Sequence, residues 1–576
     1  MLLNLEDEIN LEKIEDFKKP DTDPIKKKRI IRGLILLFLV FQIVYVVIIL
    51  VFLLKTKDEI ICKYITHSEG ETIEIINKEA IKDINFNVII NKDIKEENIF
   101  KYTFEKAGEQ TVIFKFKKDV KSLGNLFNNI DKMIEIDLSK INPDAYSNIS
   151  GLFSDCESLQ KIDFGIYIKN ITYMDEVFTG CNSLKELNLS TFKTEYAKSM
   201  ERLFTGCHSL KSIDLSSFNT KNIINMENLF AGCRELENID LSKFNFENVE
   251  DMSYMFSDCQ KLNEIDFGNT KTNNLKRMIG IFMDCKSLKS LNLENFLTSN
   301  IEDMSLLFYN CEKLEELNNF QFKTINVRNM NKMFSNCQSI KSLNLSFFNT
   351  KNVTNMKEMF HNCKSLISIN LENFNTKKVV YFESQFSNCS SLTNLDLNSF
   401  STDDSEEMEN MFSGCSSLET LNISNFKGLK LNNVKNMFEG CVKLRSIDLS
   451  FLENTNGIMY TSGMFKNCIN LKQMNFPKMN TFFLFETDEM FSGCKEMENL
   501  DLSNLITASV KDMTRMFFGC SSLKSLDIIK FNTRSLKNYD DIFGEIDNIT
   551  NIKYNEDKTE QISNQIKEIL NKNKTD

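Results

Sequence analysis

Hydrophobic and polar positions repeat with a period of 26 residues through most of this chain of 576 residues. In one repeat, IDLSSFNTKNIINMENLFAGC at residues 213–233, the first three positions alternate apolar, polar, apolar. That alternation is typical of a short β-strand with one buried face. Farther along, Met226, Phe230 and Cys233 follow one another at spacings of four and three. This spacing predicts a short helix with one apolar face.

The repeats keep a common phase, which is marked by cysteine. Each of fifteen cysteines has Phe three positions before it and an apolar residue three positions after it. Isoleucine takes the same position in one further repeat at each end, at Ile130 and Ile546. Only two intervals depart from 26 residues, and they are 25 and 27. The fifteen are Cys156, Cys181, Cys207, Cys233, Cys259, Cys285, Cys311, Cys337, Cys363, Cys389, Cys415, Cys441, Cys468, Cys494 and Cys520.

A fixed period of this length is typical of a solenoid, in which each repeat forms one coil and buries its apolar face against its neighbours. One strand and one helix per repeat predict an α/β solenoid of about 17 coils over residues 121–555. Residues 55–120 contain TVIFKFKKDV, a predicted strand, and form a juxtamembrane or N-cap region. Residues 556–576 are charged and predict a C-terminal tail.

One segment outside the repeats is strongly apolar. Residues 33–54 include 22 positions without a charge, enough for a helix to cross a hydrocarbon core of roughly 30 Å. We therefore predict a transmembrane signal anchor at residues 30–54. Five basic residues lie between positions 26 and 32, which favours a cytoplasmic tail at residues 1–29. In this single-pass (type II) topology the repeats lie outside the plasma membrane.

The repeated phrases C-x-x-L-x-x-L-x-L-S-x-F-x-T and N-V-x-x-M-x-x-M-F-x-x-C resemble those of the BspA-like leucine-rich repeat surface proteins. Leu210, Phe218, Thr220, Met226 and Phe230 fit them within one repeat. The resemblance covers residues 121–555 and implies a leucine-rich-repeat solenoid on the cell surface. It also implies a binding role, often adhesion to other cells.

Composition and charge argue against several other functions. A net charge of −12 and a pI of about 5.2 are unfavourable for binding nucleic acid, which requires a basic face. The only histidines, His67, His208 and His361, are far apart, and no glycine-rich phosphate loop occurs. The repeat cysteines are at least 25 residues apart, whereas zinc ligands usually come in close pairs. We predict a protein that is not an enzyme, with no catalytic residues and no metal site among these cysteines.

The repeat cysteines have two open interpretations. Stacked coils would bring neighbouring cysteines close enough for disulfide bonds. Alternatively, they form a buried structural ladder, which Ile130 and Ile546 favour because isoleucine cannot form a bridge. Cys62 lies outside the array and is the expected partner for an intermolecular disulfide.

The middle residue of each predicted strand is always Asp or Asn, and we expect it to point outward on the concave face. We call this row the Asx stripe. It consists of Asp163, Asn188, Asp214, Asp240, Asp266, Asn292, Asn318, Asn344, Asn370, Asp396, Asn422, Asp448, Asn475, Asp501 and Asp527.

The Asx stripe also has two open interpretations. One is a structural ladder of hydrogen bonds between side chains of successive coils. The other is a ligand-binding track for cations, glycans or a basic protein. Asp214, Asp240 and Asp266 follow one another, so Ca²⁺ or a Lys- and Arg-rich ligand is expected there first. No other cofactor is expected.

Several N-x-S/T sequences could carry glycans if the repeats are extracellular. Asn148, Asn170 and Asn352 lie in connecting segments, where a glycan is best tolerated. Two functions remain open. The first is a membrane-anchored binding or adhesion protein for an extracellular protein or glycan ligand. The second is a coat or scaffold protein that self-associates.

Overall fold

A computed structural model describes residues 58–81, 85–165, 168, 170–318, 320 and 322–572, together with residues 33, 40, 42 and 44. The chain divides into two compact units, Met1–Lys57 and Asp58–Asp576. The predicted cytoplasmic tail, and the predicted membrane anchor apart from four positions, lie outside the described residues. In the part of the chain that the structure does describe, no helix is long and apolar enough to cross a membrane.

The second unit begins with a small β-sheet, the N-terminal cap. Its neighbouring strands are antiparallel except for the last pair. The strand order is β4 (Asp93–Glu97), β3 (Phe86–Ile90), β6 (Gly108–Phe116), β1 (Glu59–Thr66), β7 (Met133–Asp137) and β8 (Lys161–Asp163), and a separate pair joins β2 (Glu71–Glu74) to β5 (Lys101–Phe104). A 3-10 helix, η3 (Glu79–Ile81), precedes β3 in the chain.

The N-terminal cap and the solenoid share this sheet. Strand β7 belongs to the first coil and pairs antiparallel with β1 on one side and parallel with β8 of the second coil on the other. The cap therefore covers the edge that the first coil would otherwise leave open. Cys62 lies in β1 and is 0% exposed. The expectation that Cys62 forms an intermolecular disulfide is wrong, because its side chain faces the buried side of the cap sheet.

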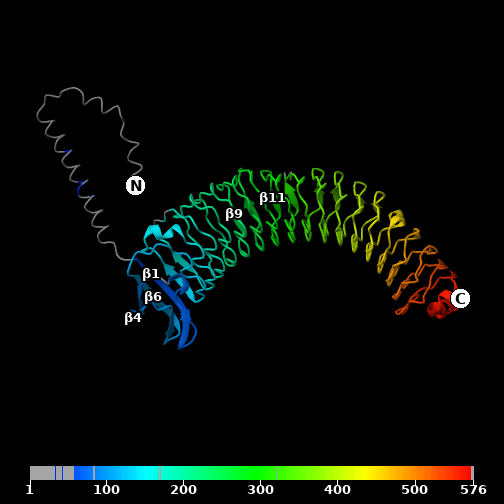
Figure 1. Cartoon of the computed structure of the whole chain (residues 1–576), viewed down its shortest axis with the longest axis horizontal. Helices are drawn as coiled ribbons and strands as arrows, with labels where there is room; N and C mark the ends of the chain where they lie inside the picture. The colour runs from blue at the N-terminus through cyan, green and yellow to red at the C-terminus, as the bar shows by residue number, and fades with distance from the viewer. Residues whose placement is uncertain are drawn as a thin grey trace, which may run out of the picture. The chain divides into compact units, whose positions relative to one another are not determined.

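Successive coils stack side by side in sequence order (Figure 1). The predicted strands are present as three-residue segments in most coils, but not at residues 186–188, 212–214 and 446–448. Those that pair within the solenoid are parallel and in register at a shift of 26 residues, such as Glu264 with Asn238. Seventeen equivalent positions from Ile130 to Ile546 mark about 16 full turns. The strands are β9 (Asn238–Asp240), β10 (Glu264–Asp266), β11 (Ser290–Asn292), β12 (Glu316–Asn318), β13 (Ser342–Asn344), β14 (Ser368–Asn370), β15 (Asn394–Asp396), β16 (Thr420–Asn422), β17 (Gln473–Asn475), β18 (Asn499–Asp501), β19 (Ser525–Asp527) and β20 (Asn551–Lys553).

The predicted helices are absent from the described residues of 121–555, where only two 3-10 helices occur, η4 (Pro143–Ser147) and η5 (Ser450–Asn454). The prediction of an α/β fold is therefore wrong, and the protein is a β-solenoid. Each expected helix is a run of turns, and a second parallel ladder of isolated bridges, such as Ser199 with Asn225, crosses this part of the coils.

Backbone hydrogen bonding explains why the turns do not become a helix. The amide of Phe204 donates to the next coil, at Leu229 O (3.0 Å), whereas that of Cys207 donates within its coil, at Phe204 O (3.1 Å). A helix needs every amide for bonds within its own segment. Turns of this kind still bring an apolar residue to the core every three or four positions. The spacing in the sequence therefore fits turns as well as it fits a helix.

Left-handed residues recur in every coil. The residue before each repeat cysteine, and before Ile130 and Ile546, has φ between 55° and 76°. It is Gly, Asn or Asp except at Glu545, as expected because these residues tolerate that conformation best. A second left-handed residue lies four positions earlier, for example Arg202 with φ of 53°. Two such residues per run of turns exclude a continuous helix.

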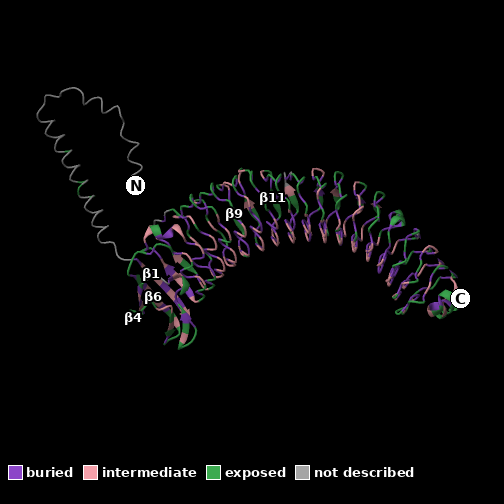
Figure 2. Cartoon of the chain, in the orientation of Figure 1, coloured by how far each residue is buried: buried purple, intermediate pink, exposed green. Residues whose placement is uncertain are grey.

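Buried residues recur in every coil along the solenoid (Figure 2), and phenylalanine side chains stack among them. The phenylalanine three positions before each cysteine, from Phe127 to Phe543, lies on its equivalents in the neighbouring coils. Ring centroids are 5.3–6.4 Å apart, and the stacked rings are close to parallel. Residues at equivalent positions of the sequence repeat therefore contact one another in the core.

The repeat cysteines form a buried ladder of free thiols beside the phenylalanines. Each Sγ donates a hydrogen bond of 3.0–3.3 Å to the carbonyl oxygen of the phenylalanine in the preceding coil. Burial raises the pKa of the Cys415 thiol to about 12, which keeps its proton on sulfur for this bond. The position therefore selects a small apolar side chain that is also a weak donor.

Replacing Cys415 with alanine should lower the free energy of unfolding by about 1–2 kcal/mol, because a buried sulfur and its bond to Phe386 O (3.1 Å) are lost. Cys415→Ser keeps a donor and should cost less. Thermal unfolding of both variants, followed by circular dichroism, measures the difference. Equal losses would show that the thiol acts only as an apolar filler.

The last coil is covered by the C-terminal segment. It contains η6 (Glu556–Lys558), η7 (Glu560–Ile562) and α2 (Ser563–Lys572), and α2 contacts β20. Ile566 is 0% exposed. The expected C-terminal tail is therefore an ordered C-terminal cap in its described part, residues 556–572. Since its own residues cover both ends of the solenoid, we expect residues 58–576 to fold as an independent unit.

Candidate functional site

The strand ladder presents the Asx stripe on its outer side. The side chains of Asn318 and Asn475 lie outside the described part of the structure. Of the thirteen described members, eleven are exposed and two, Asn370 and Asp527, are partly exposed. The row is available to a ligand along the full length of the solenoid.

Each described member of the Asx stripe closes a turn within its own coil. Its Oδ1 accepts a hydrogen bond of 2.8–3.2 Å from the backbone N–H two residues later. Asp and Asn both supply this acceptor, which explains why the two alternate freely along the row. The expected ladder between coils is thus largely replaced by Asx turns, although Asn422 Nδ2 does donate to Asp396 Oδ1 at 2.9 Å.

The turn uses one oxygen of each aspartate and does not use the second, which at Asp527 pairs with Lys553 at 3.2 Å. Hydrogen bonds from Ser216 and Ser242 lower the pKa of Asp214 and Asp240 respectively, so both are ionised near neutral pH. Asp240 pairs in register with Asp266 through β9 and β10. Three carboxylates therefore follow one another at roughly 4.8 Å per coil. This row attracts cations or a basic ligand.

The irregular coil carries a hollow of about 570 Å³ beside the Asx stripe, at Asp448. It coincides with the 27-residue interval between Cys441 and Cys468, where η5 replaces the usual turn. Its lining combines the buried Met474 and Phe476 with the exposed Glu453 and Lys478. The volume is in the range of small-ligand pockets. The lining includes Asp448, Leu449, Glu453, Met474, Phe476 and Lys478.

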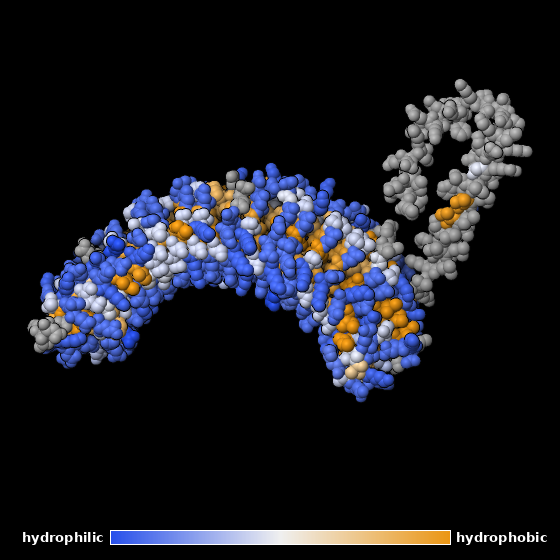
Figure 3. All heavy atoms as spheres, turned by 180° about the vertical axis from the view of Figure 1, so that it is seen from behind, coloured by the Kyte–Doolittle hydropathy of each residue, from blue (hydrophilic) through white to orange (hydrophobic). Residues whose placement is uncertain are grey.

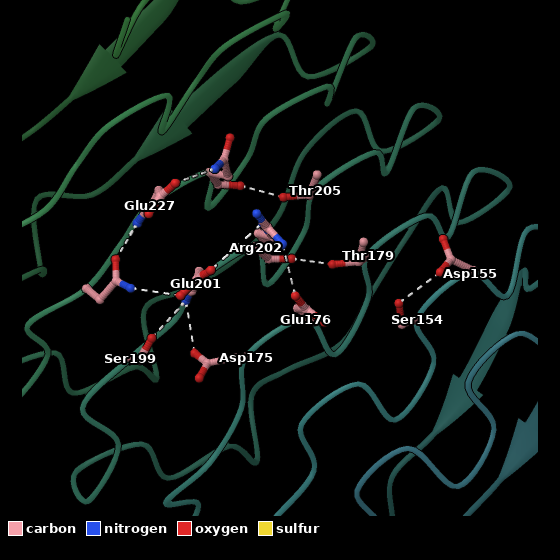
Figure 4. Close-up of polar contacts among 12 residues, drawn as sticks. Ser154, Asp155, Asp175, Glu176, Thr179, Ser199, Glu201, Arg202, Thr205 and Glu227 are labelled. Atoms are coloured by element: carbon pink, nitrogen blue, oxygen red, sulfur yellow. Dashed lines mark hydrogen bonds and ion pairs between the residues drawn. The ribbon is translucent and has the colours of Figure 1, made fainter. Parts of the chain in front are cut away.

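A second acidic row, which the sequence analysis missed, lies on the run of turns. Asp175, Glu201 and Glu227 occupy the same position in three consecutive coils (Figure 4). Asp175 Oδ1 accepts from the Glu201 amide at 3.0 Å. Burial, reinforced by Glu227, raises the pKa of Glu201. The Gly, Asn or Asp before each cysteine was the available signal that this segment forms turns with an outward face.

Other chemistry finds little support in the described residues. No group of three or more His, Cys, Asp or Glu side chains in them could hold a metal ion. His67 follows β1, whereas His208 and His361 lie in different coils, so the structure brings no two of the three histidines together. The repeat cysteines are buried and protonated, and therefore poor nucleophiles and metal ligands.

The predicted glycosylation positions differ in their surroundings. Asn170 is exposed, whereas Asn148 and Asn352 are partly buried. The Asn352 side-chain nitrogen, which would carry the glycan, donates to Ile325 O at 2.9 Å in the preceding coil. Asn148 Oδ1 accepts from the Ser150 amide at 3.1 Å. The geometry favours Asn170 among the three.

The repeats match a known family throughout. The family model described as "Mycoplasma protein of unknown function, DUF285" matches residues 82–188, 147–265, 228–346, 276–395, 328–452 and 459–575. The chain belongs to this family. The first five DUF285 matches overlap, and the six together cover residues 82–575 apart from 453–458, which includes part of the N-terminal cap. No curated protein matches the chain.

Solved structures with some likeness to this DUF285 protein include bacterial leucine-rich repeat proteins. A leucine-rich cell surface protein from Faecalibacterium prausnitzii is 14% identical, with a TM-score of 0.28, over 68% of this chain and 84% of that one. A leucine-rich repeat protein from Eubacterium ventriosum is 16% identical, with a TM-score of 0.27, over 50% and 83%. One from Leptospira interrogans is 15% identical, with a TM-score of 0.21, over 79% and 94%.

Proposed function

We propose that this DUF285 protein is a non-catalytic binding module of the cell surface, related to the BspA-like repeat proteins, that recognises an extracellular protein or glycan. The observation that supports this most is the Asx stripe, in which eleven of the thirteen described side chains are exposed at the same position of successive coils. Contacts at one coil would be weak, because the row contains no aromatic side chain. Many equivalent contacts in series would add to a useful avidity.

Within the stripe, Asp214, Asp240 and Asp266 are the proposed centre of binding. Their carboxylates lie on consecutive coils and are exposed, and none of them is in an ion pair within the described residues. A ligand with Lys and Arg side chains, or one bound through Ca²⁺, fits such a row. The proposed topology places the row outside the cell, with the predicted anchor at residues 30–54 in the plasma membrane.

The test distinguishes the loss of charge from a change in the structure of the stripe. Asp214→Asn, Asp240→Asn and Asp266→Asn together remove three charges but keep every Asx turn, because Asn serves that role elsewhere in the stripe. Residues 58–576 are first screened against matrix proteins and glycans. The triple variant should then bind the ligand about tenfold more weakly or worse. Unchanged affinity would contradict the proposal.

A matched control keeps the change in net charge the same. The variant with Asp163→Asn, Asp396→Asn and Asp448→Asn also loses three exposed carboxylates from the stripe, but no two of them lie on consecutive coils. Its affinity should change less than about twofold. Size-exclusion chromatography with light scattering, with and without Ca²⁺, tests the coat alternative, which predicts self-association of the unit.

A further inference from the structure

In each coil a turn links the strand ladder to the bridge ladder, and we call the row of these turns the loop edge. The residue eleven positions before the repeat cysteine lies in this turn and is often Asn, whose side chain forms a hydrogen bond with the preceding coil. Five such amides donate to the carbonyl oxygen 27 residues earlier at 2.7–2.9 Å: Asn222, Asn248, Asn274, Asn326 and Asn352. The usual loop edge is therefore polar and contributes to stacking.

The loop edge departs from this pattern at Phe482 and Phe483, of which Phe483 takes the position of the bridging Asn. Phe482 is 71% exposed and Phe483 is 47% exposed, with their ring centroids 5.0 Å apart. In the next coil Ile506 is 48% exposed. The face drawn in Figure 3 is largely hydrophilic, with apolar areas separated from one another. Two exposed aromatic rings that replace a stabilising amide indicate a role other than folding.

Basic residues adjoin these rings on the following coils. Ser509 Oγ donates to Phe482 O at 2.9 Å, and Ser535 Oγ donates to Ala508 O at 2.7 Å, so three successive turns of the loop edge lie side by side. In the same coils, the Lys537 amide donates to Lys511 O at 2.8 Å. The phenylalanines and the basic side chains therefore form one continuous surface.

This surface is basic in an acidic protein. Segments 478–485, 504–511 and 530–537 contain no Asp or Glu, although the chain has a net charge of −12. We call these three segments the basic-aromatic edge. Its five bases are exposed, and none is in an ion pair within the described residues. By contrast, Lys430 on a preceding coil is paired with Asp404 at 2.6 Å. The five are Lys478, Lys511, Lys530, Arg534 and Lys537.

Acidic side chains border the basic-aromatic edge on the run of turns. Glu486 is held by Lys435 at 2.5 Å, and Asp512 accepts from Asn538 Nδ2 at 2.8 Å. An anionic partner would be repelled by that neighbouring face. Contact is therefore confined to the edge itself, which fixes the orientation of the partner.

We propose that the basic-aromatic edge docks on the surface of an anionic lipid bilayer. Phe482, Phe483 and Ile506 project from an edge, as side chains that enter the headgroup region must, and the bases beside them complement lipid phosphates. A linear edge of three coils can meet a flat surface along its whole length. This inference does not depend on the ligand of the Asx stripe.

The test uses residues 58–576 with sedimenting vesicles of phosphatidylcholine alone or of phosphatidylcholine and phosphatidylglycerol in equal amounts. The unit should bind the anionic vesicles at least about tenfold more strongly, and salt should weaken that binding. The variant F482S/F483N, which recreates the natural pair Ser299 and Asn300, should lose about tenfold in partitioning. K511Q/R534Q/K537Q should lose at least as much.

Two controls keep the result specific. Ile325 lies at the position of Phe482 in another coil and is 39% exposed, so I325S should bind like the wild type. The triple variant of Asp214, Asp240 and Asp266 should also bind vesicles normally. Circular dichroism checks the fold of each variant.

Three results would overturn the proposal: no binding to either vesicle, equal binding to both, or normal binding by F482S/F483N. If residues 58–576 do not bind vesicles but form a dimer that F482S/F483N abolishes, the basic-aromatic edge binds protein. The proposal that it binds lipid is then wrong.

Discussion

Phe308→Ala is expected to lower the free energy of unfolding of residues 58–576 by about 3–5 kcal/mol. The Phe308 ring is fully buried and lies between Phe282 and Phe334, with centroids 5.6 and 5.3 Å away. Its removal leaves a cavity that the stacked rings cannot close without breaking the register of both neighbouring coils. Urea unfolding followed by circular dichroism measures the loss, and hydrogen exchange locates it near residues 282–334.

The matched control is Phe482→Ala, which removes the same atoms from an exposed position. It should change the stability by less than about 0.5 kcal/mol. A loss below about 1 kcal/mol for Phe308→Ala would mean that the phenylalanine stack does not hold the coils together. Unfolding of a repeat protein need not be two-state, so a single free energy of unfolding does not show which coils lose stability. Hydrogen exchange identifies those coils directly.

Deleting residues 556–576 is expected to unfold the last coil and to cause aggregation. The C-terminal cap buries Ile562 and Ile566 and covers β20, whose free edge could otherwise pair with another chain. A milder variant, Ile566→Asp, should reduce hydrogen-exchange protection of β20 by about 100-fold or more, since a charge cannot be buried there unpaired. Coils far from this end should keep their protection.

Glu568→Ser serves as the control for Ile566→Asp because Glu568 lies two positions later on the same helix and is exposed. Its exchange protection and its oligomeric state should match those of the wild type. Wild-type behaviour of the 556–576 deletion would show that the last coil is stable without the cap and that this segment is a dispensable tail.

The turns show where sequence reasoning reached its limit. Met226, Phe230 and Cys233 are all buried, as their spacing predicted. That spacing cannot distinguish a helix from successive turns, because both return to the core every three or four residues. The segment forms turns and not a helix if alternate amides, such as that of Phe204, donate hydrogen bonds to carbonyl groups of the next coil. Those acceptors exist only once the coils are stacked.

For the Asx stripe too, part of the structure was predicted from the sequence and part was not. Its members and their outward direction followed from the alternation of the strand. The role of Oδ1 in closing a turn did not, because the N–H two residues later is oriented by the tertiary structure. The basic-aromatic edge was also not predicted, since Phe482, Lys511 and Arg534 are distant in sequence and meet only across coils.

By itself, the sequence determined the period, which positions of successive repeats are equivalent, and the identity of the exposed stripe. These features follow from one-dimensional periodicity, which in a solenoid becomes contact between equivalent positions of neighbouring coils. The sequence favoured a buried ladder of cysteines but left disulfide bonds open, and the structure shows free buried thiols. The tertiary structure decided that the repeats are turns rather than helices, and that both ends of the solenoid are covered. It also decided which charges stay unpaired. Those outcomes depend on hydrogen bonds and ion pairs between coils, where each group's partner belongs to another repeat.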